Sequence, residues 1–175
     1  MKKLRLIVTT KCDKNCEGCC NNQFDITNLP TIEPHEMSQY DEIIITGGEP
    51  MLVPGRVETL IHYLRTFELY KGNIIIYTTD LYSISELDVC GDINGITVTL
   101  HDDYDLEEFE DTMRRYLKFN DTWLKNKSLR LNVFKDVRLP QKEYLKDWIV
   151  KDNIEWIDNC PLPKEENLKL LKNLL

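Results

Sequence analysis

Short runs rich in Ile, Val and Thr alternate with amphipathic stretches along most of the chain, which leaves few folds open to it. Six runs of four to six residues are predicted strands: Leu4–Thr9, Glu42–Thr46, Asn73–Thr78, Gly95–Leu100, Leu129–Phe134 and Ile154–Ile157. Strands that alternate with helices form right-handed βαβ units and therefore a parallel sheet. Six units are too few for a closed eight-fold barrel, which takes about 250 residues. We therefore predict an α/β fold, a partial (β/α)6 barrel of parallel strands that is open on one side.

The stretches between these strands repeat apolar residues every three to four positions, as helices with one buried face do. The predicted helices are Glu33–Gln39, Gly55–Tyr70, Ser83–Val89, Asp105–Phe119 and Gln141–Val150. The Leu-rich end, Lys164–Leu175, is predicted to form a C-terminal helix that packs on the rest of the fold.

Two predicted strands indicate how the faces of the sheet differ. Around Gly95–Leu100 the apolar residues alternate with polar ones: Ile96, Val98 and Leu100 against Thr97, Thr99 and His101. Leu129–Phe134 alternates in the same way, with Arg130 and Asn132 in its second set. Alternate residues of a barrel strand point to opposite faces, so we expect the apolar set to meet the helices. The polar set would then face the lumen and suit a polar ligand; a half-solvated sheet is the alternative.

Length and charge exclude several classes of protein. The chain has 175 residues, and we predict a single domain over residues 1–175. Its 22 Lys and Arg against 30 Asp and Glu give a net charge of −8, which disfavours nucleic acid as a partner. No apolar run approaches the roughly 20 residues of a membrane span, so no membrane partner is expected. The apolar stretch after the basic Met1–Arg5 is too short for a signal peptide, and we expect a cytoplasmic location.

Four of the six cysteines lie within nine residues, just after the first predicted strand: Cys12, Cys16, Cys19 and Cys20. A structural zinc site takes four ligands, usually in two separated pairs. The spacing Cys12-x3-Cys16-x2-Cys19 suits a [4Fe–4S] cluster better, with thiolates on three irons and the fourth iron open. Zinc remains the alternative, with Cys20, Cys90, Cys160 or a histidine as the fourth ligand.

A second motif, Gly47-Gly48-Glu49-Pro50, follows the second predicted strand. Glycine admits unusual backbone angles and lets the backbone approach a ligand closely. Glu49 places a carboxylate at the carboxyl end of its strand, where parallel β/α folds build their sites. Alone, this tetrapeptide would be a plain strand-to-helix turn. Because the cysteine loop also follows a strand, both motifs are expected on the same edge of the sheet.

Together the two motifs resemble those of the radical S-adenosylmethionine (radical SAM) superfamily, in which Cys-x3-Cys-x2-Cys follows the first strand and Gly-Gly-Glu the second. The resemblance implies a [4Fe–4S] cluster held by Cys12, Cys16 and Cys19, with S-adenosylmethionine on the open iron. Glu49 and the turn Gly47–Pro50 would bind the methionine end. Further cofactor contacts are implied at the ends of the next strands: Thr78, Thr79, Thr99, His101 and Asn132.

The reaction that the resemblance implies begins with one electron from an external donor. The reduced cluster would cleave S-adenosylmethionine to methionine and a 5′-deoxyadenosyl radical, which abstracts hydrogen from a substrate. The stretch Cys16–Asn21 is similar to Cys-x-Gly-Cys-x-Asn of the activating enzymes of anaerobic ribonucleotide reductase, which implies a glycyl-radical enzyme as substrate or partner. The run Thr46–Leu52 is similar to enzymes that make deazapurine precursors, the 7-carboxy-7-deazaguanine synthases. A non-catalytic iron–sulfur or zinc-binding module is a further alternative.

Expectations also follow for the other cysteines and for the mouth of the barrel. Cys20 is expected to be a packed or free thiol, and Cys90 to lie in the core. Cys160 is expected on the site edge, where it could act in substrate binding or redox chemistry. The chain leaves little material for a lid, so we expect an open mouth that suits a protein substrate or partner.

Overall fold

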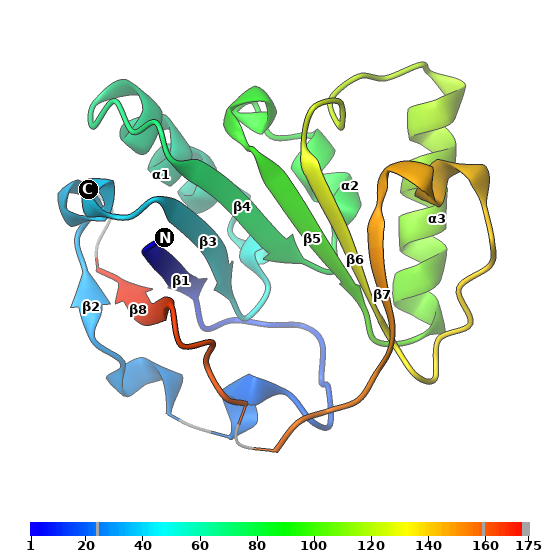
Figure 1. The fold of residues 1–175 in the computed structure, drawn as a ribbon, viewed down its shortest axis with the longest axis horizontal. Coiled ribbons are helices and arrows are strands. Elements are labelled where there is room, and N and C mark those ends of the chain that lie inside the picture. The colour runs from blue at the N-terminus through cyan, green and yellow to red at the C-terminus, as the bar shows by residue number, and fades with distance from the viewer. Residues whose placement is uncertain (24, 159, 173–175) are drawn as a thin grey trace.

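One sheet of eight parallel strands, which does not close on itself, forms the centre of the fold (Figure 1). It is seen in a computed structural model that describes residues 1–23, 25–158 and 160–172. The strands are β1 Lys3–Thr9, β2 Thr31–Ile32, β3 Glu42–Gly47, β4 Asn73–Thr78, β5 Gly95–Leu100, β6 Ser128–Phe134, β7 Ile149–Ile154 and β8 Glu166–Leu171. Their order in the sheet is β2-β8-β1-β3-β4-β5-β6-β7. The α/β class and the parallel sheet are confirmed, although the sheet has two more strands than predicted.

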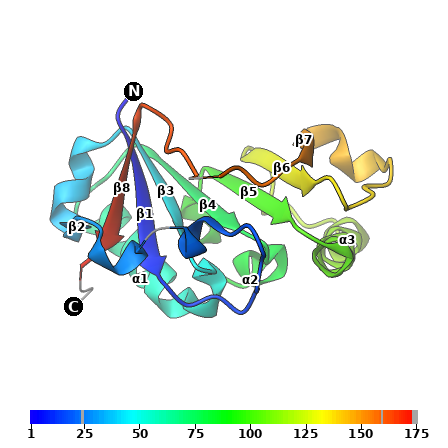
Figure 2. The same ribbon diagram turned by 90° about the horizontal axis from the view of Figure 1, so that it is seen from below.

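Three α-helices cover one face of this sheet (Figure 2). They are α1 Pro54–Thr66, α2 Leu81–Ser85 and α3 Asp103–Lys118. Short 3-10 helices lie in the connections: Cys20–Asn22, Ile26–Asn28, Pro34–Gln39, Pro50–Leu52, Cys90–Asp92 and Glu143–Asp147. In the part of the chain that is described, no helix combines the length and apolar character needed to cross a membrane.

The two long helices form where apolar spacing predicted them, and each has a clear start. Pro54 occupies the first turn of α1, where its missing N–H leaves no hydrogen bond unmade. The Asp102 side chain accepts a hydrogen bond from the backbone N–H of Asp105 and so caps α3. The predicted helix Ser83–Val89 is shorter than expected, because α2 ends at Ser85.

The core lies between the sheet and the helices, and the alternation along β5 and β6 explains why. Ile96, Val98 and Leu100 are fully buried in this core. Thr99 and Asn132, from the alternate set, instead line a cavity on the opposite face. The predicted division of the two strands is therefore confirmed for the apolar set and for Thr99, His101 and Asn132 of the polar set, whereas Thr97 is buried and does not line the cavity. Cys90 lies in the core as expected.

The predicted C-terminal helix over Lys164–Leu175 is wrong. Residues Glu166–Leu171 form strand β8, which inserts between β1 and β2, whereas residues 173–175 lie outside the described part. Asn167, Leu168, Lys169 and Leu170 alternate with the period of a strand. The deciding factor is tertiary, because β8 satisfies the backbone groups on the edge of β1 that β3 leaves free.

The structure also differs from the prediction over residues 141–157. The expected helix Gln141–Val150 is reduced to the 3-10 turn Glu143–Asp147, and the expected strand Ile154–Ile157 lies earlier, as β7 over Ile149–Ile154. β7 pairs along the free edge of β6, and five of its six residues are exposed. An exposed edge strand carries no apolar alternation, so its sequence does not reveal it.

The connection from β7 back to β8 crosses the face of the sheet that the helices leave uncovered (Figures 1 and 2). We call this connection the strap; its described residues are 155–158 and 160–165. Trp156, Ile157 and Cys160 of the strap line the cavity on that face. The expectation of an open mouth without a lid is therefore wrong, because the strap lies over it.

Candidate functional site

A cavity of about 530 Å³ lies on the strap side of the sheet, toward the carboxyl ends of its strands. This volume is in the range of small-molecule sites, roughly 300–1,000 Å³. All of the predicted site residues except Pro50 line the cavity. Pro50 is buried at the start of the 3-10 turn Pro50–Leu52, so its role is to shape that turn.

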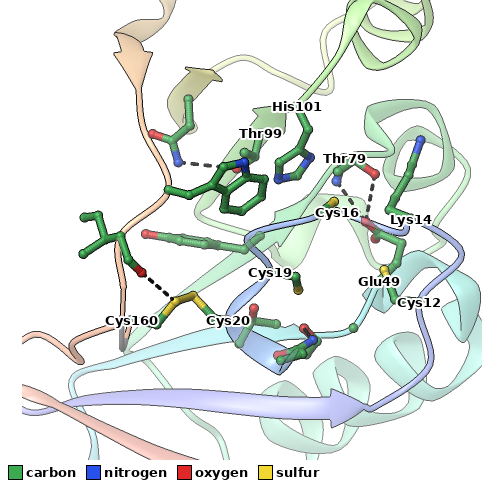
Figure 3. Close-up of a pocket in the computed structure, with 18 of the residues that line it drawn as sticks. Cys12, Lys14, Cys16, Cys19, Cys20, Glu49, Thr79, Thr99, His101 and Cys160 are labelled. Atoms are coloured by element: carbon green, nitrogen blue, oxygen red, sulfur yellow. Dashed lines mark hydrogen bonds between the residues drawn. A yellow bond between two sulfur atoms is a disulfide. The ribbon is translucent and has the colours of Figure 1, made fainter. Parts of the chain in front are cut away.

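The cysteine loop enters the cavity directly after β1, and Cys12, Cys16 and Cys19 all line it (Figure 3). A tight turn holds the loop, since the N–H of Cys19 donates to the carbonyl of Cys16 over 3.3 Å. Burial raises the pKa of the Cys16 thiol to about 11, and the neighbouring Cys19 and Cys12 add to this. Burial also raises the pKa of Cys12.

The donor chemistry of this loop fits an iron–sulfur cluster, although the thiols are not arranged to hold a single metal ion. Across residues 1–23, 25–158 and 160–172, no group of three or more Cys, His, Asp or Glu side chains has a geometry that could bind an ion. Three free thiols nevertheless face one cavity. A [4Fe–4S] cluster takes each thiolate on a separate iron and so needs the sulfurs farther apart than a single ion does.

The Gly47-Gly48 turn packs against the backbone that leads into the cysteine loop. The N–H of Gly48 donates to the Thr9 carbonyl and the N–H of Glu49 to the Lys11 carbonyl, both over 2.8 Å. A Cβ on Gly48 would lie 1.9 Å from the Lys11 oxygen, and Gly47 has a φ of +145°. Glycine is thus required here for loop-to-loop packing. The sequence predicted a close approach to a ligand, and the close approach seen is to the cysteine loop.

Asn21 joins the same two motifs from the other side of the loop. Its side-chain amide donates to the Gly47 carbonyl over 3.0 Å. The residue follows Cys19 by two positions, within the run that is similar to Cys-x-Gly-Cys-x-Asn. The cysteine loop and the glycine turn therefore form one unit, held by main-chain contacts and by this amide.

The carboxylate of Glu49 is buried and fully hydrogen-bonded. One oxygen accepts from the Met51 N–H (3.0 Å) and the Thr78 hydroxyl (2.5 Å). The other accepts from the Thr79 N–H (2.9 Å) and the Thr79 hydroxyl (3.0 Å). A carboxylate offers about four lone-pair sites, so the protein occupies all of them. Thr78 and Thr79 thus orient Glu49, and an ammonium group would have to displace or share one of their hydroxyls.

Thr99, Asn132 and His101 line the wall formed by the ends of β5 and β6. The Asn132 amide donates to the Thr99 hydroxyl over 3.4 Å, which leaves both groups with hydrogen-bonding capacity toward the cavity. His101 directs its Nδ1 at the carboxylate of Asp105, 3.1 Å away.

Asp105 is a site residue that the sequence analysis missed. It is completely buried, and its second oxygen accepts from Lys14 Nζ of the cysteine loop over 2.7 Å. Burial pushes the pKa of Asp105 upward, but hydrogen bonds from His101 and Lys14 outweigh burial and hold the pKa below its ordinary value. Asp105 therefore joins the loop, the end of β5 and the start of α3. The closely spaced Asp102 and Asp105 after a strand were a usable signal for this helix start.

Trp156 is the second missed residue, because the sequence analysis placed it inside a strand. Its ring stacks on His101 at 5.4 Å between centroids and meets Phe134 at 4.1 Å. It also covers Gly18, where a Cβ would lie 2.3 Å from the tryptophan ring. The strap thus packs directly on the cysteine loop.

A disulfide between Cys20 and Cys160 adds a covalent link between the same two segments (Figure 3). Cys20 was expected to be a packed or free thiol, and that prediction is wrong. Cys160 lies on the site edge, as expected. The two residues are 140 positions apart, so their pairing is not apparent from spacing.

The chain matches no family model and no curated protein. The fold and the lining of the cavity are therefore the basis for any assignment of function.

Proposed function

We propose that the chain is a radical SAM enzyme in which Cys12, Cys16 and Cys19 hold a [4Fe–4S] cluster and the Gly47–Pro50 turn binds the methionine end of S-adenosylmethionine. The observation that carries the proposal is the junction between the two motifs. Hydrogen bonds from Glu49 to Lys11 and from Asn21 to Gly47 join the cysteine loop to the turn beside one cavity, and a third, from Gly48 to Thr9, joins the turn to the end of β1. A metal loop without a paired cofactor would not need this connection.

The proposal includes the finer description of the fold as a partial (β/α)6 barrel. Its support is the asymmetry of the sheet, with α1, α2 and α3 on one face and a cavity on the other. The open side would lie between the edge strands β7 and β2, which the strap bridges on its way to β8.

The residues of this chain would bind and orient the cofactors. Glu49, fixed by Thr78 and Thr79, places a negative charge beside the loop and would attract the ammonium of S-adenosylmethionine. The bound cluster would supply one electron from an external donor and cleave S-adenosylmethionine to methionine and a 5′-deoxyadenosyl radical. The strap and Trp156 would exclude water from this step.

The substrate under this proposal is either a small molecule or a protein such as a glycyl-radical enzyme. The strap favours a small molecule, because it covers the face that a protein substrate would otherwise approach. The two alternatives that the motifs suggest differ in the kind of substrate. A deazapurine-precursor synthase would act on a small molecule, whereas the activator of an anaerobic ribonucleotide reductase would act on a protein.

The test is anaerobic reconstitution with iron and sulfide, followed by dithionite and S-adenosylmethionine. We expect a brown protein that forms 5′-deoxyadenosine, and expect Cys12→Ser and Cys16→Ser to lose both properties. Cys90→Ser, which removes a thiol that does not line the cavity, is the matched control. A colourless protein that retains zinc would overturn the proposal in favour of a zinc-binding module. A brown protein that never consumes S-adenosylmethionine would overturn it in favour of an electron carrier.

A further inference from the structure

Among the described residues that line the cavity, only Arg5 and Lys14 are lysine or arginine. Lys14 is engaged by Asp105 at 2.7 Å and by Glu108 at 3.8 Å. Arg5 lies on β1, on the lumen face of the sheet, and its side chain is 22% exposed. Arg5 is also paired, with Glu166 at 2.7 Å, but through its Nε alone, so its two terminal nitrogens are the cationic donors that the described part of the lining has available for a ligand.

The guanidinium of Arg5 is held on one edge and on one face. Its Nε donates to Glu166 of β8 over 2.7 Å, and its central carbon lies 4.9 Å from the centre of the Tyr77 ring. Stacking on an aromatic ring fixes the plane of a guanidinium and adds a favourable interaction with its charge. The side chain is thus oriented before any ligand binds.

Among the described residues, Glu166 is the one ion-pair partner of Arg5, and the contact is made through Nε. The two terminal nitrogens of Arg5 make no hydrogen bond with those residues. They form a fork of N–H donors, the geometry that binds carboxylate or phosphate through two parallel hydrogen bonds. Because Glu166 already occupies Nε, these terminal donors are the part of Arg5 that a ligand can take up.

The depth of Arg5 separates it from the Glu49 region. Arg5 pairs in register with Ile44, whereas Thr9 pairs with Gly47 at the upper end of the same two strands. β1 is irregular between Ile7 and Thr9, so the spacing is taken along β3, where the three residues from Ile44 to Gly47, at about 3.3 Å each, place these levels about 10 Å apart. A group bound by Arg5 therefore lies deeper in the cavity than one bound beside Glu49.

We propose that Arg5 binds an oxyanion group, carboxylate or phosphate, of a small substrate that enters the lumen below the cysteine loop. The identification of this ligand as the substrate rests on the proposed function. The anion-binding subsite itself rests on Arg5, Tyr77 and Glu166.

The test uses the metal-free full chain, with no S-adenosylmethionine, titrated with inorganic phosphate or with malonate at constant ionic strength. The readout is the NMR signal of the Arg5 Nε–H group. We expect a saturable shift with at least one of the anions, and the anion that binds more tightly indicates the class of oxyanion. Arg5→Gln should abolish saturable binding, and Arg5→Lys, which keeps the charge opposite Glu166 but loses the fork, should weaken it. Binding to these two variants is followed by calorimetry.

Glu166→Gln separates a ligand site from a structural ion pair. It keeps Arg5 and removes the competing carboxylate, so it should tighten anion binding by about threefold or more, the scale of one partly screened charge. Arg138→Gln, at an exposed arginine outside the cavity, should leave binding unchanged. Absence of saturable binding in the parent chain would overturn the inference, as would equal binding by Arg5→Gln or weaker binding by Glu166→Gln.

This experiment and the cofactor assay fail independently. Anion binding without formation of 5′-deoxyadenosine would retain the subsite and remove the radical SAM proposal. Formation of 5′-deoxyadenosine without anion binding would do the reverse.

Discussion

Glu49 shows how a single carboxylate can hold a site together before any ligand is bound. It accepts hydrogen bonds from two backbone N–H groups and two threonine hydroxyls. Glu49→Gln replaces one acceptor oxygen by an NH₂ donor that faces these donors. We expect the free energy of unfolding to fall by about 1–3 kcal/mol, the cost of leaving a buried donor unpaired. Urea unfolding measures this change.

The control for this variant is Glu58→Gln. Glu58 accepts one backbone hydrogen bond, from Asp88, at an exposed site. Its replacement should change stability by no more than about 0.5 kcal/mol, as for most surface substitutions. Equal stability of the Glu49→Gln variant and the parent chain would contradict the buried network around Glu49.

The buried carboxylate of Asp105 should make the stability of the folded chain sensitive to acid. Its pKa lies below the ordinary value in the folded chain, so it favours folding at any pH above the unfolded value of about 3.9. This contribution is lost as the pH falls from that value through the lower folded pKa. Asp105→Asn should therefore destabilise the chain at neutral pH and flatten the dependence of stability on pH below about 4.

Unfolding free energies from urea titrations at pH 7 and at several values below pH 4 test this prediction. Asp136→Asn is the control, because Asp136 is exposed and its carboxylate makes no hydrogen bond or ion pair with the described residues; it should leave the dependence on pH unchanged. If Asp105→Asn left the dependence of stability on pH unchanged, the prediction would be wrong, and the acid sensitivity of the parent chain would come from other carboxylates.

Packing of the strap on the cysteine loop is the main feature at the scale of elements. Gly18→Ala would place a methyl group 2.3 Å from the Trp156 ring, so the ring and its segment of the strap must move. Overpacking of this kind typically costs about 1–3 kcal/mol. We expect a shift of tryptophan fluorescence together with faster proteolysis of the strap.

Gly91→Ala is a close match for this variant, because a Cβ at Gly91 would meet nothing within 4 Å. It should leave both fluorescence and proteolysis unchanged. If Gly18→Ala behaved in the same way, Trp156 would not cover the loop in solution.

Elements with a strong internal pattern were predictable from sequence, and those that depend on partners were not. β5 and α1 show clear periods of two and three to four, and both lie where they were expected. β7 and β8 form because β6 and β1 have free edges, and that information is not local to either segment. The site divides in the same way. The two motifs pointed to one edge, whereas Asp105, Trp156 and the Cys20–Cys160 pair depend on contacts distant in sequence.

At the scale of the whole molecule, the disulfide closes almost the entire chain into one loop. Cys20 and Cys160 are 140 residues apart, and the segment between them contains β2 to β7 and all three α-helices. In the chain-entropy model, a cross-link over about 100 residues or more stabilises the folded state by about 5 kcal/mol. Reduction should therefore lower the free energy of unfolding by up to that amount and release the strap from the cysteine loop.

Urea unfolding with and without dithiothreitol measures this loss, and thiol alkylation with mass spectrometry identifies the cysteines that become reactive. The double variant Cys20→Ser and Cys160→Ser should unfold like the reduced parent chain and should not respond to the reductant. Cys90→Ser should keep the full response, since Cys90 is a free thiol in the core. A parent chain that shows no response, with Cys20 and Cys160 already open to alkylation, would mean that Trp156 and the main-chain contacts alone hold the strap over the cavity.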